Sequence, residues 1–199
     1  MSDAPLRVAL FEPLFEECNR TRRLIAEMRR HLLDEGISLH LVELPGTGES
    51  LIEIAGVRLS DWQDAAQTEV AAIKPTVIAS IRGGALFDAA GDAKGRWRFA
   101  PETGARLVRD LRRTQLAGEG TKLYAGNALS EAFLAELEGI VLAPLTPLRT
   151  LRLDSDTADC DARVPGSPLW RRAEPGEDPA LAVALAADLA EWTRTCAAL

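Results

Sequence analysis

The sequence predicts an α/β protein with a mostly parallel, twisted sheet and helices on both faces. Three observations lead to this fold class. Short apolar runs rich in β-branched residues alternate with longer segments whose apolar residues recur at helical spacing. Turns that contain glycine or proline separate these segments, and no internal repeat interrupts them. Strands that alternate with helices favour parallel pairing, because each helix returns the chain across the sheet.

The expected strands are apolar runs bounded by turn residues. The first stops at Pro13, and the loop 45–50 closes the second. The central run follows Pro75 and continues unbroken to Ile81, which is typical of a strand covered on both faces. The expected strands span residues 6–11, 37–44, 76–81, 96–100 and 148–153, and 122–127 is a short strand or edge segment.

Amphipathic segments fill the intervals between the strands. In the first of them, Leu24, Met28 and Leu32 form one apolar stripe, arginines occupy the other face, and Gly36 suits the C-terminal cap. The segment 88–95 is polar and rich in alanine and glycine, so the helix after the central strand should be short. The expected helices span residues 19–35, 61–73, 101–116, 130–138 and 178–197.

Size and composition fit one globular domain over residues 1–199. The chain is 47% hydrophobic and 27% charged, which is ordinary for such a domain. Its net charge of −7 argues against a nucleic-acid partner held by a broad basic surface. No apolar stretch approaches the ~18 residues that a membrane span requires. The first residues lack the basic and apolar regions of a secretory signal, so a cytoplasmic location is expected.

The sequence contains no recognisable pattern of a metal-binding or phosphate-binding site. Cys18, Cys160 and Cys196 are widely spaced and odd in number, which favours reduced thiols over a disulfide framework or a metal site. The loop 46–50 is not a phosphate-binding P-loop, because no lysine follows its glycine. We therefore expect no metal and no other cofactor.

The carboxyl edge of the sheet is where a ligand is expected, because parallel sheets bind ligands at the carboxyl ends of their strands. The loops predicted to meet there are 13–17, 45–50, 80–84, 101–103, 154–156 and 165–170. The most informative is the sharp turn at Gly83 and Gly84, directly after the central strand.

This turn lies where an α/β-hydrolase carries its nucleophilic serine, in the motif Gly-x-Ser-x-Gly. Aligned on its last glycine, the motif reads Ser80-Ile81-Arg82-Gly83-Gly84. Arg82 therefore takes the place of the nucleophile. A guanidinium remains cationic at any working pH and cannot attack a carbonyl group.

The other parts of a serine-hydrolase triad are also in question. His31 is expected on a helix flank and His40 half-buried in a strand, and no later histidine exists to complete the order serine, acid, histidine. Ser80 and Cys18 remain as non-standard nucleophiles, and Asp154 follows a strand as a triad acid would. The competing interpretation of Ser80 is a buried strand serine that bonds to backbone. The competing interpretation of Asp154 is a carboxylate that is solvated or paired with a cation. An active hydrolase or acyltransferase on an ester or thioester stays as one alternative.

Arg82 has two interpretations of its own. Its guanidinium fork suits a carboxylate or phosphate, and Gly83 and Gly84 would let an anion approach the first N–H groups of the next helix. The other interpretation is an internal ion pair, because a buried arginine without a partner is costly. The candidate acidic partners are Glu12, Glu16, Glu17 and Asp154.

Three segments, in this order, resemble a known family. They read Glu-Pro-Leu-Phe-Glu-Glu-Cys-Asn-Arg-Thr-Arg-Arg at 12–23, Leu-Pro-Gly-Thr-Gly-Glu-Ser at 44–50 and Ile-Arg-Gly-Gly-Ala-Leu at 81–86. They resemble the α/β-hydrolase-like proteins associated with the bacterial exosortase A system, whose elbow Gly-Leu-Arg-Leu-Gly-Ala also has arginine in place of serine. The chain departs from that pattern at Ser80 and Gly83, and it is shorter after the elbow.

The resemblance implies an α/β-hydrolase-like fold with a reduced cap region and a degenerate site. It also implies a binding or accessory role in an exosortase or exopolysaccharide system. The ligand would be an anionic small molecule or a protein partner, and Arg20 would lie near the former oxyanion loop. A dimerising scaffold protein with a vestigial pocket is a further alternative. The residues expected to bind the ligand are Arg82, Gly83, Gly84, Leu14, Phe15 and Asn19.

Overall fold

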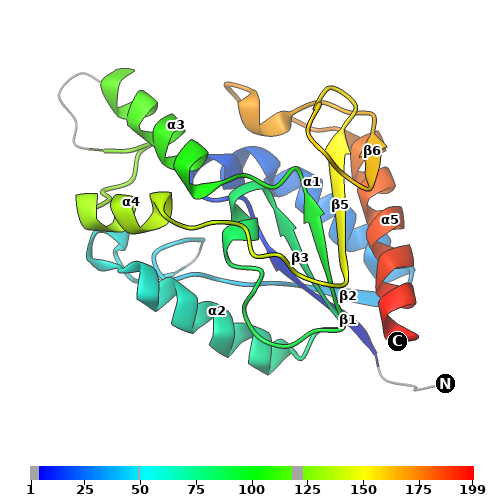
Figure 1. The fold of residues 1–199 in the computed structure, drawn as a ribbon. Helices are drawn as coiled ribbons and strands as arrows, with labels where there is room; N and C mark the ends of the chain where they lie inside the picture. Colours follow the sequence, from blue (N-terminus) through cyan, green and yellow to red (C-terminus); the bar gives the residue numbers. More distant parts are fainter. Residues whose placement is uncertain (1–4, 49, 118–122) are drawn as a thin grey trace.

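A six-stranded, all-parallel sheet forms the centre of the computed structural model, which describes residues 5–48, 50–117 and 123–199 (Figure 1). The predicted parallel α/β class is confirmed. The strands are β1 (Leu6–Phe11), β2 (Ile37–Leu41), β3 (Val77–Ile81), β4 (Gly95–Phe99), β5 (Leu148–Leu153) and β6 (Ala162–Val164).

The strand order β2-β1-β3-β4-β5-β6 contains one reversal of direction. From β1 the chain adds β2 on one side, and then crosses to β3 and adds the remaining strands on the other side. Strands β1 and β3 are direct neighbours, with Phe11 opposite Ser80 at their carboxyl ends. A crevice at such a switch point is the usual ligand site of an open α/β sheet. The topology thus brings the loop after β1 beside the turn after β3.

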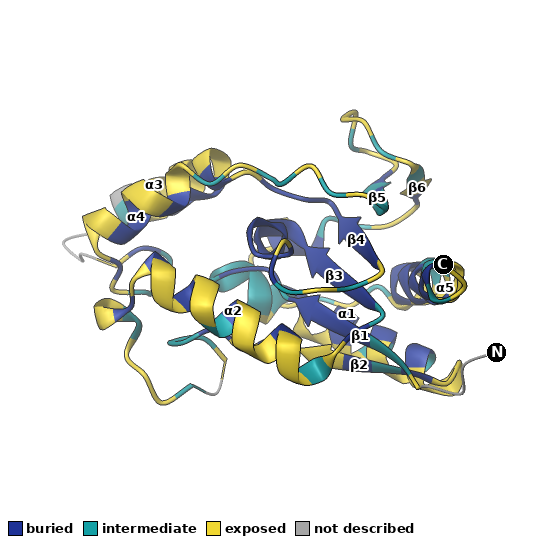
Figure 2. Ribbon diagram, turned by 60° about the horizontal axis from the view of Figure 1, so that its bottom comes forward, coloured by how far each residue is buried: buried dark blue, intermediate teal, exposed yellow. Residues whose placement is uncertain are grey.

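Helices cover both faces of the sheet, and each face has its own apolar core (Figure 2). Alternate residues of one strand face opposite cores: Val8 and Leu10 contribute to the first, and Ala9 and Phe11 to the second. The first core is covered by α1 (Glu16–Asp34) and α5 (Pro179–Ala197), and the second by α2 (Leu59–Ile73), α3 (Gly104–Ala117) and α4 (Glu131–Glu138). Figure 2 shows buried strands between helices whose outer sides are exposed.

Several elements differ from their predicted bounds. Helix α1 starts at Glu16, three residues before the predicted residue 19. The loop ends at Phe15, whose φ of 56° is not helical, and the two glutamates of the first turn suit the positive end of the helix dipole. Strand β6 was not predicted, since three residues carry too little periodicity. In the region 122–127, residue 122 lies outside the described residues, and Tyr124 and Asn127 form an isolated bridge instead of a strand.

His40 is exposed on β2, so its predicted half-buried position was wrong. It lies near the end of a sheet-edge strand, beside Leu41, which is also exposed. In the part of the chain that the structure describes, no helix is both long and apolar enough to cross a membrane.

Candidate functional site

The turn after β3 is a tight elbow with Arg82 at its apex. Arg82 has a φ of 54°, a left-handed conformation that is uncommon for a residue with a side chain and that tends to occur at functional sites. A 3-10 helix of five residues, Arg82–Leu86, follows directly. The chain therefore keeps the backbone of a nucleophile elbow while presenting a cation.

Gly84 allows the elbow to pack against β1. A Cβ atom at this position would lie 2.4 Å from the carbonyl oxygen of Phe11 and 2.6 Å from that of Glu12. A Cβ at Gly83 would meet only the side chains of Leu14 and Leu107, at 3.2 Å. Both glycines are buried, and Gly84 lies close against the backbone at the end of β1.

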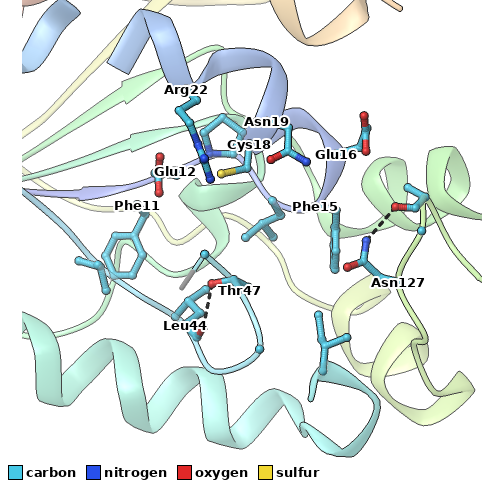
Figure 3. A pocket seen from close by; sticks show the side chains of 18 residues that line it. Phe11, Glu12, Phe15, Glu16, Cys18, Asn19, Arg22, Leu44, Thr47 and Asn127 are labelled. Atoms are coloured by element: carbon cyan, nitrogen blue, oxygen red, sulfur yellow. Dashed lines mark hydrogen bonds between the residues drawn. The ribbon is translucent and has the colours of Figure 1, made fainter. Parts of the chain in front are cut away.

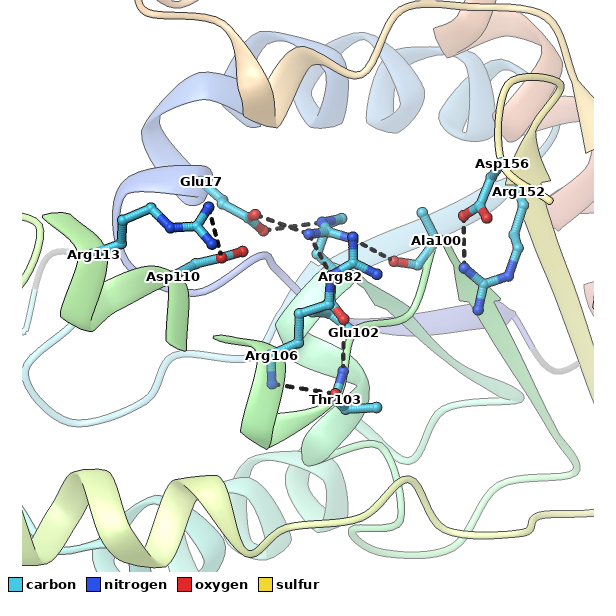
Figure 4. A network of polar contacts seen from close by, with 10 residues as sticks. All are labelled: Glu17, Arg82, Ala100, Glu102, Thr103, Arg106, Asp110, Arg113, Arg152 and Asp156. Carbon is cyan, nitrogen blue, oxygen red and sulfur yellow. Dashed lines mark hydrogen bonds and ion pairs between the residues drawn. The ribbon is translucent and has the colours of Figure 1, made fainter. Parts of the chain in front are cut away.

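The guanidinium of Arg82 is held by two carboxylates and a carbonyl (Figure 4). Its Nε and Nη2 donate to the two carboxylate oxygens of Glu17, both at 3.1 Å. Nη2 also donates to Glu102 Oε2 at 3.0 Å, and Nη1 donates to the carbonyl oxygen of Ala100 at 3.2 Å. Because Arg82 is only 9% exposed, its fork is engaged inside the protein.

The charges of this cluster depend on one another. Burial alone would lower the pKa of Arg82, but Glu17 and Glu102 outweigh it and raise that pKa. Burial raises the pKa of Glu17 against the opposing effect of Arg82. Arg106 adds a second cation, with its Nε 3.4 Å from Glu102. The arrangement favours the internal ion-pair interpretation of Arg82, with Glu17 among the predicted partners and Glu102 as an addition.

Trp170 lies after the last strand, the part of the chain that carries the histidine in an α/β-hydrolase. In an α/β-hydrolase the histidine comes last in the chain, after the final strand. Here the loop after β6 brings the ring of Trp170 to 4.7 Å from the Arg82 guanidinium carbon, in cation–π geometry. His31 and His40 lie on α1 and β2, away from this elbow. The side chain from the last loop that contacts the apex of the elbow is therefore an aromatic ring and not a base.

Ser80 belongs to a different, fully buried network. Its hydroxyl donates to Asp88 Oδ2 at 2.8 Å, rather than to backbone as one interpretation expected. Asp88 accepts two further hydrogen bonds from Arg98, at 2.7 and 2.8 Å. Ser80 and Asp88 are both 0% exposed. The serine thus neither contacts a histidine nor reaches the surface.

Asp154 is exposed at the end of β5. Its backbone N–H donates to Val164, and its carboxylate makes no ion pair or hydrogen bond with the described residues. The neighbouring Asp156 accepts from Arg152 at 2.8 Å. Hydrogen bonding from the Ala158 backbone, followed by Arg152, lowers the pKa of Asp156. Neither aspartate has a histidine to orient.

The loop after β1 lines a cavity of about 430 Å³ at the carboxyl ends of β1 and β2 (Figure 3). Three of the predicted binding residues, Leu14, Phe15 and Asn19, lie on its wall. Leu14 and Phe15 also line a smaller cavity of about 180 Å³, which includes Arg82. The structure thus gathers four of the six predicted residues around two adjacent cavities, whereas Gly83 and Gly84 line neither of them.

Cys18 lies on the wall of the larger cavity beside Glu12 and Arg22 (Figure 3). Burial, followed by the negative charge of Glu12, raises the pKa of the Cys18 thiol to about 11. Burial also raises the pKa of Glu12 itself. A thiol with this pKa is almost entirely protonated at neutral pH and is a poor nucleophile.

Glu102 and Trp170 were not singled out from the sequence, although both lie in strand-end loops predicted to meet at this edge. Glu102 lies 20 positions and Trp170 lies 88 positions after Arg82 in the chain, so these contacts are long-range. The signal that could have found Glu102 is its position directly after Pro101, at the carboxyl end of the strand next to the elbow. Among the described residues, no three His, Cys, Asp or Glu side chains are grouped to hold a metal ion.

Comparison with known proteins identifies the fold. The sequence matches no protein-family model and no curated protein. Its structure is similar to the esterase domain of a Rhodothermus marinus protein, with a TM-score of 0.62, 15% identity, and 97% of this chain and 88% of that chain covered. It is also similar to the thioesterase RedJ of the prodiginine pathway in Streptomyces coelicolor, with a TM-score of 0.54, 15% identity, and 95% and 86% covered.

A third similar structure is the bottromycin epimerase BotH, with a TM-score of 0.50, 17% identity, and 100% of this chain and 92% of that chain covered. Identities this low establish a shared fold rather than a shared reaction. Together with the parallel sheet, the elbow after β3 and the helices on both faces, these likenesses show that the chain has an α/β-hydrolase-like fold.

Proposed function

We propose that this protein is a catalytically inactive α/β-hydrolase-like protein that acts by binding a ligand or partner. One observation carries the proposal: the elbow presents Arg82, and Glu17 and Glu102 bind its guanidinium. Covalent catalysis at an elbow needs a nucleophile activated by a neighbouring base. An ion pair at that point supplies neither group.

The alternative of an active hydrolase finds less support in the geometry. Ser80 is buried and bonded to Asp88, and Cys18 is held in its protonated form. Neither side chain has a histidine among its contacts in the described residues. Esterase or thioesterase chemistry of the kind named for the similar structures would therefore require a site other than the elbow.

The binding role rests on the cavities beside the elbow. Leu14, Phe15 and Asn19 line a cavity of about 430 Å³, within the size range of small-molecule sites. Gly84 lets the elbow pack closely against the end of β1, which leads into the loop that lines this cavity, and Gly83 beside it contacts Leu14 of that loop. The resemblance to exosortase-associated proteins suggests that the partner system is a bacterial exosortase or exopolysaccharide locus. A cytoplasmic location suits the three unpaired cysteines, which a reducing compartment would keep as thiols.

A fluorophosphonate probe followed by intact-mass measurement tests the proposal, together with turnover of a panel of esters and thioesters. The wild-type protein should form no adduct and hydrolyse none of the substrates. Arg82→Ser should gain no esterase activity, because no histidine stands near the new hydroxyl. A stoichiometric adduct that maps to Ser80 and disappears in Ser80→Ala would contradict the proposal. Size-exclusion chromatography with light scattering separately tests the alternative of a dimerising scaffold.

A further inference from the structure

Strand β2 forms one edge of the sheet, next to β1 (Figure 2). Directly after it, the N–H of Val42 donates to the carbonyl oxygen of Leu10 at 3.0 Å. In a parallel strand, alternate residues direct their backbone groups to the same side. The N–H and C=O groups of Ile37, Leu39 and Leu41 therefore point away from β1. Among the described residues, no other segment forms a hydrogen bond with these groups.

The sequence of β2 contains none of the features that usually protect such an edge. An exposed edge pairs readily with another strand, and natural proteins prevent this with short strands, charged side chains, proline or bulges. At the opposite edge, β6 has only three residues and carries Arg163, whose guanidinium donates to the carbonyl oxygens of Asp156 and Ala158. In contrast, β2 reads Ile-Ser-Leu-His-Leu and keeps a continuous register with β1. Its backbone is thus open to a further strand.

One flank of α1 borders this open edge. Helix α1 packs against β2 on one side and α5 on the other, and α5 lies over β1, β4 and β6. Arg23 marks the α5 side, because its Nε lies 2.7 Å from Glu177, just before α5. The opposite flank, which faces away from α5, consists of four exposed residues at helical spacing: Arg22, Ala26, Arg29 and Leu33. The ion pairs of α1 within the described ranges involve Arg20 and Arg23 instead of the two arginines on this flank.

Arg29 disfavours a second copy of the chain as the occupant of this edge. A symmetric pairing of two β2 strands would bring the same flank of α1 from both copies together. Arg29 would then face the same arginines of the other copy, and like charges repel. Arg22 also lines the cavity that contains Glu12, and the exposed carboxylates of Asp34 and Glu43 follow α1 and β2 near their ends. Arg29 is therefore the cation of this flank that an incoming carboxylate would meet.

We propose that the edge of β2 binds an extended acidic segment of a partner protein as an additional strand. The backbone of that segment pairs with the outward groups of Leu39 and Leu41, and a carboxylate on its α1 side contacts Arg29. Strand addition of this kind takes its affinity from main-chain hydrogen bonds and its specificity from alternate side chains. The inference goes beyond the proposed function, because residues 37–41 line neither the 430 Å³ nor the 180 Å³ cavity.

Fluorescence anisotropy tests the proposal with a short labelled peptide in which glutamate alternates with threonine. This peptide should bind the wild-type protein, and the same peptide with lysine in place of glutamate should bind more weakly. Two further peptides carry N-methyl groups, one on every glutamate and one on every threonine. One of them should lose binding, because only alternate N–H groups of an added strand face β2.

Arg29→Glu should weaken binding of the acidic peptide about fivefold, since it replaces an attraction at the surface by a repulsion. Arg109→Glu is the matched control and should leave the affinity unchanged. It makes the same change of charge at an exposed arginine of α3, which covers the other face of the sheet. Amide hydrogen exchange supplies a second measurement, because the bound peptide should protect the outward N–H groups of Leu39 and Leu41.

Three outcomes would overturn the inference. The acidic peptide does not bind, or it binds without protecting the amides of Leu39 and Leu41, which would indicate contact through side chains alone. In the third, the amides become protected as the protein concentration rises without peptide, which would place a second copy of the chain at the edge. All three leave the proposal of catalytic inactivity standing, because the fluorophosphonate probe tests it separately.

Discussion

Arg82 combines a left-handed backbone conformation with a guanidinium that two carboxylates bind. Each part is costly alone, since φ near 54° disfavours a side chain and a buried cation needs compensation. Glu17 supplies a bidentate contact, and Trp170 covers one face of the guanidinium. The residue is therefore fixed by its partners rather than poised to react.

Removing the Arg82 side chain should destabilise the fold strongly. Arg82→Ala leaves Glu17 buried without its cation and Glu102 with only the half-exposed Arg106, so the free energy of unfolding should fall by about 3–5 kcal/mol. The loss should be smaller at pH 4 than at pH 7, because a protonated carboxyl group does not need a cation. Urea unfolding followed by circular dichroism measures both values.

Arg113→Ala is the control for this measurement. Arg113 forms an ion pair with Asp110 at 3.7 Å, but its side chain is 74% exposed, and surface pairs of this kind contribute little. Its substitution should change stability by less than about 0.5 kcal/mol. Equal effects of the two substitutions would contradict a structural role for the Arg82 cluster.

Glu12 should make the protein less stable as the pH rises. Because the folded-state pKa of Glu12 is raised by burial, its contribution is fully present below the unfolded pKa and is lost as pH rises through the folded pKa. Glu12→Gln removes that ionisation. The variant should gain stability relative to the wild type at pH 7 but not at pH 4. An identical stability difference at both pH values would contradict this expectation.

Cys18 should react slowly with alkylating reagents despite lining a cavity. With a pKa of about 11, its thiolate fraction at pH 8 is on the order of 100-fold below that of an ordinary thiol. Iodoacetamide labelling with peptide mapping measures the rate. Glu12→Gln should accelerate it, since the charge of Glu12 helps to raise the Cys18 pKa. A rate unaffected by Glu12→Gln would show that this charge does not act on the thiol.

The elbow and strand β1 act as one packed unit. The short 3-10 helix after β3 lies against the last residues of β1, and only a residue without Cβ fits at Gly84. This close packing places the loop that follows β1 beside Arg82. The position of Glu17 at the start of α1 depends on the same contact between the two strands.

Gly84→Ala should therefore disrupt the site together with the fold. Its Cβ would lie 2.4 Å from a backbone oxygen that cannot move without shifting β1, so we expect a loss of about 3 kcal/mol. Gly83→Ala is a matched control, because its Cβ would meet leucine side chains at 3.2 Å that can adjust. The control should cost about 1 kcal/mol or less. Thermal unfolding compares the two, and a similar loss in both variants would contradict the proposed packing constraint.

The molecule as a whole has two apolar cores that share one sheet. Leu185 of α5 belongs to the first core and Leu134 of α4 to the second, and both are 0% exposed. The central strands β1 and β3 contribute residues to both cores, so loss of packing on one face would disturb the strands that support the other. We therefore expect residues 1–199 to fold as one domain.

Core substitutions on the two faces test this expectation. Leu185→Ala and Leu134→Ala should each lower the free energy of unfolding by about 2–5 kcal/mol. Circular dichroism and tryptophan fluorescence should report one coincident transition in both variants. Two separated transitions, each shifted by only one of the substitutions, would show that the faces unfold independently.

The sequence by itself determined the fold class, the elbow and the unusual residue at its apex. Alternating strands and helices are readable because their periodicities of two and 3.6 residues are local. The replacement of serine by Arg82 and the lack of a histidine after position 40 are likewise properties of the chain alone. Strand β6 was missed because three residues are too few to show a period.

Only the tertiary structure decided which residues meet Arg82. Its acidic partners lie 65 and 20 residues away, and Trp170 lies 88 residues away, on loops that converge only when the strands pair in the order β2-β1-β3-β4-β5-β6. Sequence patterns placed several acidic residues at this edge and could not choose among them. The choice depends on side-chain geometry at the neighbouring carboxyl ends of β1, β3 and β4. That geometry arises from long-range strand pairing and has no local signature in the sequence.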